Sequence, residues 1–224
     1  QTFRGAGGLW EGVRPEEIAS IEAWERDPEA VLRFYNQRRA QVRAARPNAA
    51  HWALARLCRE IPATIVTQNV DDLHERAGAS PVLHLHGEIL KARSSLHPLY
   101  RIDLKEADIH LGDRCPEGAQ LRPDVVWFGE AVPAMTEAAG LVAEADLFAV
   151  IGTSLQVYPA AGLLDLVPDG CRCVAIDPSI PDAARFAGFE CHARSACEGV
   201  PPWVEGILAE IRNRQEQEPQ RPGL

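Results

Sequence analysis

The stretch IPATIVTQNVDDLHERAG, residues 61–78, is informative about the fold because an apolar run in it ends abruptly in polar side chains. The run at residues 61–66 predicts a buried strand. The polar residues Gln68, Asn69, Asp71 and Asp72 follow it. In an open sheet of parallel strands, ligands bind just beyond the carboxyl ends of the strands. We therefore expect this strand to deliver polar groups to a binding site.

Three further apolar runs predict strands, at residues 82–86, 147–151 and 173–176. Each ends in residues that suit a ligand, namely His86 with Gly87, Gly152 with Thr153 and Ser154, and Asp177. Helical patterns lie between most of these runs, and Asn48 is placed to cap one of the helices. Strands that alternate with helices predict an α/β fold with a parallel sheet covered on both faces. We expect the polar strand endings to meet in one crevice.

Two segments do not fit this alternation, and they predict a second, smaller lobe. Asp27 and Pro28 form an N-cap and first-turn pair for a helix that runs to about Ala45. Residues 88–122 are polar and rich in turns, without clear periodicity, and are too many for a simple connection. We expect the helix and this insertion to form the second lobe together. A C-terminal helix is expected to begin near Pro201, with a disordered tail after it.

Composition and charge exclude several classes of function. The chain is 46% hydrophobic and 25% charged, with a formal net charge of −9. A general nucleic-acid binder needs clustered Lys and Arg, and the one basic cluster, Arg38–Arg46, is expected to be the solvated face of a helix. No apolar run is long enough to span a membrane, so we expect neither nucleic acid nor membrane as a partner. The six cysteines are scattered, and no secretory leader is recognisable, which together favour a cytoplasmic protein.

Taken singly, the candidate residues also have plainer explanations. Gly152, Thr153 and Ser154 suit phosphate or ribose oxygens, and they suit a tight turn between strand and helix equally well. Asp177 matches the carboxylate that binds ribose hydroxyls in dinucleotide sites, and it is equally a turn or cap residue. His86 is a candidate general base, although a histidine beside a crevice is more often a hydrogen-bonded structural residue.

Five motifs, taken in order along the chain, resemble the sirtuins, the NAD-dependent protein lysine deacylases. They are TFRGAGGLW (2–10), TQNVDDLHERAG (67–78), LHLHGE (83–88), RPDVVWFGE (122–130) and GTSLQVYPAAG (152–162). The resemblance implies a Rossmann-like NAD-binding lobe with a smaller lobe made of a helical insertion and a degenerate zinc-module insertion. The NAD-binding lobe would comprise residues 1–12, 46–87 and 123–216, the small lobe residues 13–45 and 88–122, and the flexible tail residues 217–224.

The resemblance also implies a reaction in which NAD is consumed. In sirtuins the acyl oxygen of a modified lysine attacks the nicotinamide ribose, nicotinamide leaves, and a histidine then acts as general base on the ribose hydroxyls. The products are nicotinamide, free lysine and 2′-O-acyl-ADP-ribose. Here the histidine is His86, and Asn69 would orient the ribose and a bound water. Gln68 would lie near the ribose hydroxyls, and Asp71 would hold the nicotinamide amide.

Further contacts follow from the same resemblance. The other residues expected to bind NAD are Phe3, Arg4, Gly152, Thr153, Ser154, Asp177 and Cys197. A substrate peptide is expected to lie as an added strand between two edges of the protein, at residues 125–130 and 156–158. The residues expected to contact it are Val126, Trp127, Phe128, Gly129, Glu130 and Val157. The partners are therefore proteins or peptides that carry acylated lysine.

The acyl group is indicated by FYNQRR, residues 34–39, in which Tyr35 and Arg38 lie three apart on one helix face. The pair resembles that of the desuccinylase and demalonylase branch of the sirtuins. A guanidinium can hold a carboxylate in a bidentate, charge-assisted pair, and a phenol hydroxyl can assist. We therefore expect succinyl or malonyl groups to be preferred, with weaker deacetylation. The plainer alternative is that Arg38 is surface charge.

The sequence departs from the sirtuin pattern at two places. Sirtuins usually carry four zinc cysteines, but residues 93–120 hold only Cys115, and Ser94 stands where a first ligand would be expected. We therefore expect no structural zinc. In the family, a first strand and a GAGxS loop precede the match to TFRG, so we expect that they lie outside this sequence or that this form binds NAD poorly. The alternatives are an ADP-ribosyltransferase or NAD hydrolase on the same fold, and a non-catalytic NAD or ADP-ribose binding module.

Overall fold

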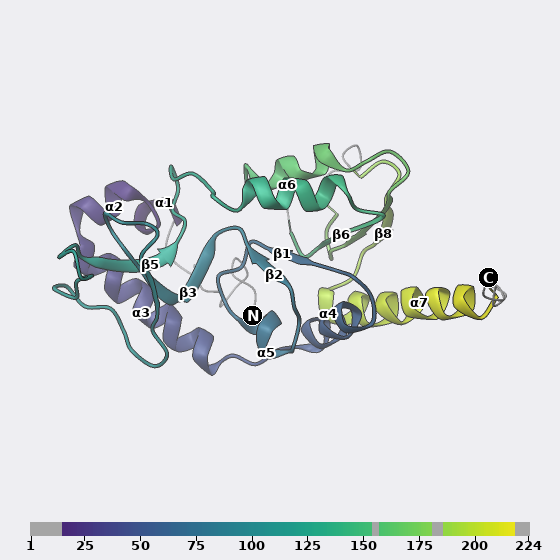
Figure 1. The fold of residues 1–224 in the computed structure, drawn as a ribbon, viewed down its shortest axis with the longest axis horizontal. Helices are drawn as coiled ribbons and strands as arrows, with labels where there is room; N and C mark the ends of the chain where they lie inside the picture. Colours follow the sequence, from purple (N-terminus) through teal and green to yellow (C-terminus); the bar gives the residue numbers. More distant parts are fainter. Residues whose placement is uncertain (1–14, 154–156, 181–185, 218–224) are drawn as a thin grey trace, which may run out of the picture. The chain divides into compact units, whose positions relative to one another are not determined.

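The structure is a computed structural model that describes residues 15–153, 157–180 and 186–217 (Figure 1). It divides into two compact units. The first consists of Gln1–Ala45, Thr67–Asp72 and His84–Ala134, and the second of Arg46–Val66, Leu73–Leu83 and Met135–Leu224. This division differs from the expected lobes, because residues 67–72, 84–87 and 123–134 belong to the first unit. They do so because they are hydrogen-bonded to the insertion and to each other.

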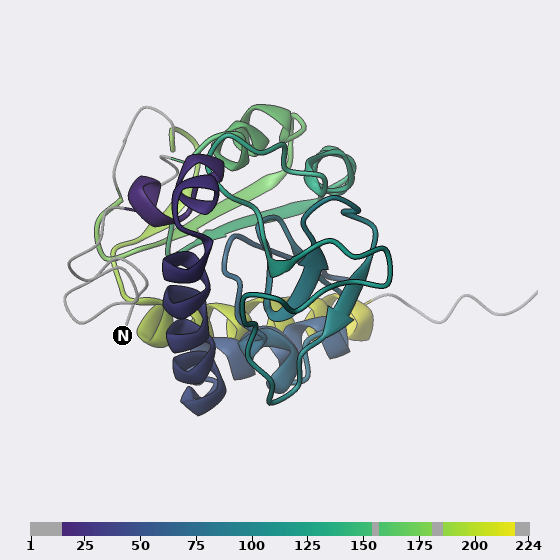
Figure 2. The ribbon, with the colours of Figure 1, turned by 90° about the vertical axis from the view of Figure 1, so that its left-hand side faces the viewer.

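Three helices open the described part of the first unit: α1 (Pro15–Ile18), α2 (Ile21–Arg26) and α3 (Pro28–Ala44). In Figure 2, α1 and α2 lie at one end of α3. Asp27 caps α3 as predicted, since its carboxylate accepts the Ala30 N–H at 2.9 Å and Pro28 occupies the first turn. The buried residues of α3 are Val31, Leu32, Tyr35, Arg39 and Val42. One of them, Arg39, was expected on a solvated face, and that prediction is wrong.

The sequence of the insertion indicated an irregular segment, but the structure shows an antiparallel sheet in the order β4-β3-β5. Its strands are β3 (Gly87–Ser94), β4 (Arg101–Asp103) and β5 (Leu121–Val125). The strand pattern was hidden because charged residues lie buried within it. Arg93, Arg122 and Asp124 are all buried, and each has an ion-pair partner. Strand β5 is buried along its whole length, so it has no polar face to reveal a period of two.

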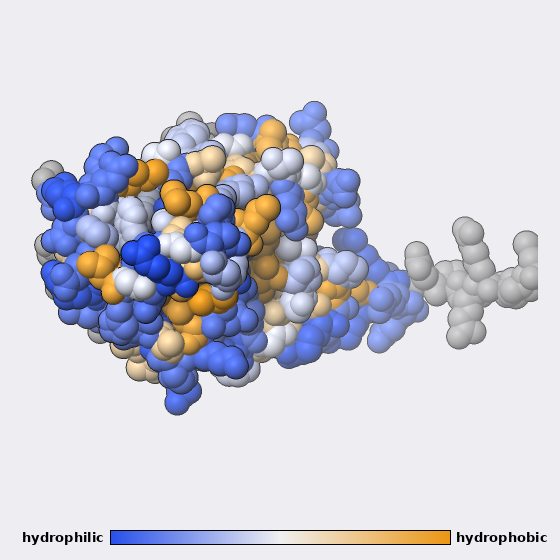
Figure 3. All heavy atoms as spheres, turned by 60° about the vertical axis from the view of Figure 1, so that its left-hand side comes forward, coloured by the Kyte–Doolittle hydropathy of each residue, from blue (hydrophilic) through white to orange (hydrophobic). Residues whose placement is uncertain are grey.

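Helix α3 packs on the insertion through two hydrophobic clusters. In the first cluster Val31, Tyr35 and Val42 meet Ile89, Val125 and Trp127. In the second cluster Leu32 meets Ala92, Ile109 and Leu121. The first unit is therefore a helix fixed against a small sheet. Figure 3 draws the atoms of the whole chain and shows small groups of hydrophobic side chains among hydrophilic ones on the face in view.

The second unit contains a parallel sheet in the order β6-β7-β8. Its strands are β6 (Leu147–Ile151), β7 (Arg172–Ile176) and β8 (Glu190–His192). Its helices are α4 (Ala49–Glu60), α5 (Leu73–Arg76), α6 (Met135–Ala143), the 3-10 helix η1 (Ala160–Leu166) and α7 (Ala196–Gln217). The strand predicted at 147–151 is confirmed, and the strand predicted at 173–176 lies within β7. Asn48 caps α4 as predicted.

The first two predicted strands are shorter than expected and pair with each other as β1 (Ile65–Thr67) and β2 (Val82–His84). The predicted start at residue 61 is wrong because Ile61 is still the C-cap of α4, where its N–H donates to Leu57. The predicted end at residue 86 is wrong because the chain turns after His84. His84 and His86 therefore do not share one strand face, as their alternation indicated.

Helix α7 covers one side of the parallel sheet with Val200, Trp203 and Val204, which pack against Val174 and Ile176 of β7. It begins before Pro201, contrary to expectation, because the N–H groups of Glu198 and Gly199 already donate to the carbonyl of Ser195. Gly199 is needed there, since a Cβ at this position would lie 2.5 Å from Ile176 Cγ2. The tail from residue 218 onward falls outside the described residues. Within the described ranges, no helix has the length and apolar character needed to cross a membrane.

Candidate active site

Main-chain hydrogen bonds hold the polar stretch after β1 beside the turn after β2. The N–H of Leu85 donates to the carbonyl of Thr67 at 2.9 Å. The N–H of Ile89 donates to the carbonyl of Val70 at 2.8 Å. His86 lies between these two bonds in sequence, so the backbone on both sides of it is fixed to the polar stretch.

The His86 side chain makes a further contact with the same stretch. Its Nδ1 lies 3.0 Å from the carbonyl oxygen of Gln68. A carbonyl can only accept, so Nδ1 carries the hydrogen, and in the neutral ring Nε2 is left as the basic nitrogen. Burial lowers the pKa of His86, and the hydrogen bond to Gln68 opposes this only in part. The imidazole is therefore largely neutral at neutral pH, which is the state that a general base requires.

The other polar residues of the stretch differ in exposure. Asp71 is buried, Gln68 is half-buried and Asn69 is exposed. The N–H of Asn69 donates to the hydroxyl of Thr67 at 3.1 Å, so the chain makes a tight turn directly after β1. The turn explains why the polar residues end the strand and do not continue it.

A glycine allows the histidine turn to approach strand β5 closely. Gly87 has φ +78°, and a Cβ at this position would lie 2.1 Å from the carbonyl oxygen of Asp124. The carbonyl of His86 accepts the N–H of Val126 at 2.9 Å. The end of β5, where the predicted peptide-contact motif at residues 125–130 begins, is thereby bonded to the turn that carries the histidine.

The motif VVWFGE continues from β5 as a tight turn held by its last residue. The Glu130 carboxylate accepts a hydrogen bond from the N–H of Trp127 at 2.8 Å. It also accepts hydrogen bonds from the guanidinium groups of Arg93 and Arg122 at 2.7 to 3.0 Å. Burial alone would raise the pKa of Glu130, but the hydrogen bonds from Arg122 and from the Trp127 N–H outweigh it and lower the pKa. The guanidinium of Arg122 also lies 3.2 Å from the centre of the Trp127 ring. Phe128, by contrast, is 41% exposed.

The tryptophan of this turn reaches helix α3. Trp127 Nε1 donates to the hydroxyl of Tyr35 at 3.0 Å, and the two rings lie 6.3 Å apart. Burial raises the pKa of Tyr35, with the hydrogen bond from Trp127 acting in the opposite direction, so the phenol stays protonated. A phenol that accepts one hydrogen bond still has its own hydrogen to donate.

Arg38 lies one turn along the same helix. Its guanidinium stacks over the Phe34 ring at 4.5 Å from the ring centre, and its side chain is half-buried. Burial lowers the pKa of Arg38, although an arginine remains charged at any physiological pH. Tyr35 and Arg38, three residues apart on α3, thus provide a neutral hydrogen-bond donor and a cation on one helix.

The remaining candidates belong to the second unit. Gly152 follows β6 with φ +61°, and a Cβ there would meet no atom within 4 Å. Asp177 follows β7, but its carboxylate already accepts the Ser179 N–H at 2.8 Å, as expected of a turn residue. Thr153 and Val157 are half-buried beside the undescribed residues 154–156, and Cys197 is exposed in the first turn of α7.

Known proteins were compared with the chain. The model of the Sir2 family matches residues 1–159. The chain belongs to the Sir2 family. An NAD-dependent protein deacylase of Bacteroides thetaiotaomicron is 48% identical over 204 residues, which cover 89% of this chain and 87% of that protein. An NAD-dependent protein deacylase of Helicobacter pylori is 50% identical over 210 residues, covering 93% and 90%. The crystal structure of a Sir2 homologue with NAD is 37% identical, with a TM-score of 0.84 and coverage of 94% of this chain and 84% of that one.

The resemblance deduced from five motifs is therefore confirmed, and the fold is that of the Sir2 family, a Rossmann-like parallel sheet with a helical lobe. Several predicted residues lie together in the first unit: Tyr35, Arg38, Gln68, Asn69, Asp71, His86, Val126, Trp127, Phe128, Gly129 and Glu130. The others that are described, Gly152, Thr153, Val157, Asp177 and Cys197, lie in the second unit. Phe3, Arg4 and Ser154 fall outside the described residues.

Sequence reasoning missed the residues that hold this Sir2 site in shape. Arg93 and Arg122 both donate to Glu130, and Arg39, which follows Arg38 on α3, is fully buried. A signal was available for Arg122, because a charged residue three positions before the apolar VVW run (125–127) must be paired if it is buried with that run. Nothing in the sequence distinguished Arg39 from its basic neighbours Arg38 and Arg43, which are half-buried.

Proposed function

We propose that the chain is an NAD-dependent protein lysine deacylase that prefers acidic acyl groups, succinyl and malonyl, and removes acetyl more weakly. The products would be nicotinamide, free lysine and 2′-O-acyl-ADP-ribose. Membership of the Sir2 family and the names of the two relatives support NAD-dependent deacylation of protein lysines. The acyl preference rests on the residues of this chain, as follows.

His86 is suited to the role of general base. Its Nδ1 is committed to the Gln68 carbonyl, so its Nε2 is free to take a proton from a ribose hydroxyl. The residues around it also fit NAD, because the amide and carboxylate side chains of residues 68–71 provide donors and acceptors for the nicotinamide and its ribose. NAD supplies the electrophilic ribose carbon and the leaving group when it is bound.

The observation that carries the acyl preference is the hydrogen bond from Trp127 Nε1 to the Tyr35 hydroxyl. This bond turns the phenol so that its hydrogen is left to donate, and burial of Tyr35 keeps that hydrogen in place. Arg38, a cation held against the Phe34 ring, lies on the same helix. The carboxylate of a succinyl or malonyl group could accept hydrogen bonds from the Tyr35 hydroxyl and from the N–H groups of Arg38. The methyl group of an acetyl group could accept neither.

The stretch Val126–Glu130 suits main-chain pairing with a substrate peptide, within limits. The N–H groups of Val126, Trp127 and Phe128 already donate to His86, Glu130 and Ala19. The carbonyl of Trp127 accepts the Glu130 N–H at 3.0 Å, so a peptide strand would pair with the carbonyl oxygens of Val126 and Phe128. Such pairing reads backbone and not side chains, which favours many protein substrates over one.

The insertion does not fit the zinc site that the family implies. Ser94, at the expected position of a first ligand, uses its hydroxyl to accept the N–H groups of Leu96 and His97 at 3.3 and 3.1 Å. Over the described ranges no three His, Cys, Asp or Glu side chains are grouped to hold a metal ion. We propose that the insertion folds without zinc. Elemental analysis should find less than stoichiometric zinc, and EDTA should leave the Tm unchanged; bound zinc that EDTA removes with a fall in Tm would refute this.

The experiment that tests the acyl preference measures NAD-dependent release of succinate and acetate from matched acyl-lysine peptides. Wild type should favour the succinyl peptide, and Arg38→Met should lose this preference while retaining deacetylation. His86→Tyr should turn over neither peptide. Arg33→Met, which removes an exposed arginine from the same helix, is the control and should behave as wild type. Equal rates on both peptides in wild type, or an unaltered preference in Arg38→Met, would contradict the proposal.

A further inference from the structure

Arg39 is an unusual residue of α3 because it is a charged side chain with no exposure to solvent. Of its neighbours in sequence, Arg38 is half-buried and Ala40 is exposed. A buried charge needs a carboxylate and a full set of hydrogen bonds to offset its lost hydration, and a well-packed apolar residue of similar size would avoid that cost. The Nη2 atom of Arg39 has no hydrogen-bond partner within the described structure. Stability alone is therefore a weak explanation for a buried arginine at this position.

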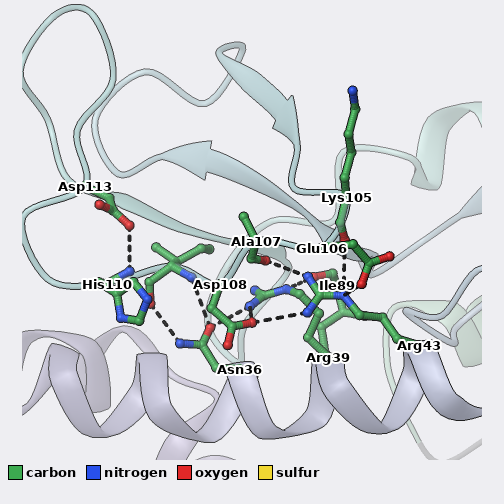
Figure 4. Close-up of polar contacts among 11 residues, drawn as sticks. Asn36, Arg39, Arg43, Ile89, Lys105, Glu106, Ala107, Asp108, His110 and Asp113 are labelled. Carbon is green, nitrogen blue, oxygen red and sulfur yellow. Dashed lines mark hydrogen bonds and ion pairs between the residues drawn. The ribbon is translucent and has the colours of Figure 1, made fainter.

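The hydrogen bonds of Arg39 go to three different parts of the first unit (Figure 4). Its Nε donates to the carbonyl of Ile89 at 2.9 Å. Its Nη1 donates to the side chain of Asn36 at 2.5 Å and to the carboxylate of Asp108 at 3.3 Å. One guanidinium thus joins helix α3, strand β3 and the loop after β4.

Asn36 completes the contact between the helix and the loop. Its side-chain amide donates to the carbonyl of Ile109 at 2.9 Å, and its oxygen accepts the Ile109 N–H at 3.2 Å. Asn36 follows Tyr35 and Arg39 follows Arg38, so each of the two acyl-recognition residues is adjacent to an anchored one. A helix with both neighbours anchored cannot rotate about its axis without breaking these bonds.

Ile89 extends the connection from the helix to the polar stretch. While its carbonyl accepts from Arg39, its own N–H donates to the carbonyl of Val70 at 2.8 Å. Val70 lies between Asn69 and Asp71, and Ile89 is three residues after His86. The path from the acyl-recognition helix to the predicted nicotinamide pocket therefore passes through one guanidinium and one residue of β3.

We propose that Arg39 is a positioning residue that holds the acyl-recognition turn of α3 in register with the polar stretch Gln68–Asp72 and the His86 turn. This inference rests on the proposed function for the roles of those segments. Arg39 touches neither substrate nor NAD in this account. It acts through Ile89 on one side and through the helix on the other.

Arg43 provides a matched comparison one turn further along α3. It donates to the carbonyls of Lys105 and Ala107 at 3.1 and 2.6 Å and pairs with Asp108 at 3.4 Å. Figure 4 shows that it reaches the same loop as Arg39, while only Arg39 is bonded to Ile89. In Arg39→Met the carboxylate of Asp108 keeps Arg43 as its partner, so this variant leaves no buried carboxylate unpaired.

The test compares Arg39→Met and Arg43→Met by hydrogen–deuterium exchange and by steady-state kinetics, well below their Tm. Arg39→Met should speed amide exchange in residues 68–72 and 84–90 by about tenfold, the effect of losing one charge-assisted hydrogen bond. Arg43→Met should speed exchange in residues 104–110 alone. With the acyl peptide that wild type prefers, kcat of Arg39→Met should fall about tenfold to a hundredfold, as misplacement of reacting groups predicts.

The inference is overturned if Arg39→Met speeds amide exchange only in residues 104–110, or if its kcat is the same as that of wild type. Where Arg39→Met is too unstable, Arg39→Lys replaces it, since lysine keeps the charge beside Asp108 but has no Nε to donate to Ile89. The exchange measurement needs no substrate. A wild type without succinyl preference would therefore refute the proposed function, while altered exchange at 68–72 would still support the role of Arg39.

Discussion

Replacing Glu130 by glutamine removes the charge on which the peptide-contact turn depends. The carboxylate receives Arg93 and Arg122, and its own side chain is 14% exposed, against 10% and 7% for the two arginines. The amide that replaces it would keep the size of the side chain and could still accept one N–H. It would leave two nearly buried guanidinium groups without a counter-charge.

The expected cost follows from that burial. Removing one partner of a buried ion pair destabilises a protein by about 3–5 kcal/mol, because the remaining charge stays buried and uncompensated. For a protein of this length, 1 kcal/mol corresponds to about 2–4 °C in Tm. Glu130→Gln should therefore lower the Tm of the first unit by roughly 6–20 °C. An exposed pair is worth far less, so Glu29→Gln, which breaks the exposed pair with Arg33, should lower it by about 1–2 °C.

The pH dependence gives a second, independent check. The pKa of Glu130 is lowered in the folded protein, so its contribution to stability is present above the unfolded pKa, about 4.3. It is lost as the pH falls through the folded pKa, where wild type acquires a neutral side chain like that of the variant. The Tm difference, measured by scanning calorimetry from pH 3.5 to 8, should be full above about pH 5 and shrink below about pH 4. If Glu130→Gln lowers the Tm at pH 7.5 by no more than Glu29→Gln does, the ion pairs of Glu130 do not stabilise the turn.

Three further outcomes are expected. The acid limb of kcat/KM should have its inflection below about pH 6.5, because burial lowers the pKa of His86; an inflection above pH 7 would contradict this. Gly87→Ala should cost at least about 2 kcal/mol in urea unfolding, and more than Gly118→Ala, which has a similar φ of +85° but no atom within 4 Å of its Cβ. Trp127→Phe should raise KM for a succinyl peptide roughly threefold more than KM for an acetyl peptide, since it removes the donor to Tyr35; equal changes would count against that bond.

The sequence was informative where local chemistry determines structure. The caps of α3 and α4 and the strand at 147–151 follow from residue types within a few positions of each other. The insertion could not be predicted in this way, because its strands contain Arg93, Arg122 and Asp124. Each of these charges has an ion-pair partner in the folded chain, and the partners of Arg93 and Asp124 lie 37 and 23 positions away. Tertiary pairing of this kind leaves no trace in hydrophobic periodicity.

In the candidate site, too, some residues could be predicted from local sequence and others could not. His86, Asn69, Tyr35 and Arg38 were predicted as site residues from motifs, that is, from residue types at short spacings along the chain. Arg39 was not, since its burial depends on Ile89 and Asp108, which lie 50 and 69 positions away. Residues that position a site act through contacts that only the folded chain assembles.

The histidine turn is held almost entirely by the main chain. Leu85 and Ile89 bond to the polar stretch through their N–H groups, Val126 bonds to the His86 carbonyl, and the His86 ring itself bonds to the Gln68 carbonyl. Bonds between backbone groups do not depend on which side chains the neighbouring residues carry. Substitutions at Tyr35 or Arg38 should therefore change which acyl group is accepted while leaving His86 in place. Arg39 differs because its side chain itself donates to the Ile89 carbonyl. A substitution of Arg39 should therefore affect both the acyl preference proposed for Tyr35 and Arg38 and the position of His86.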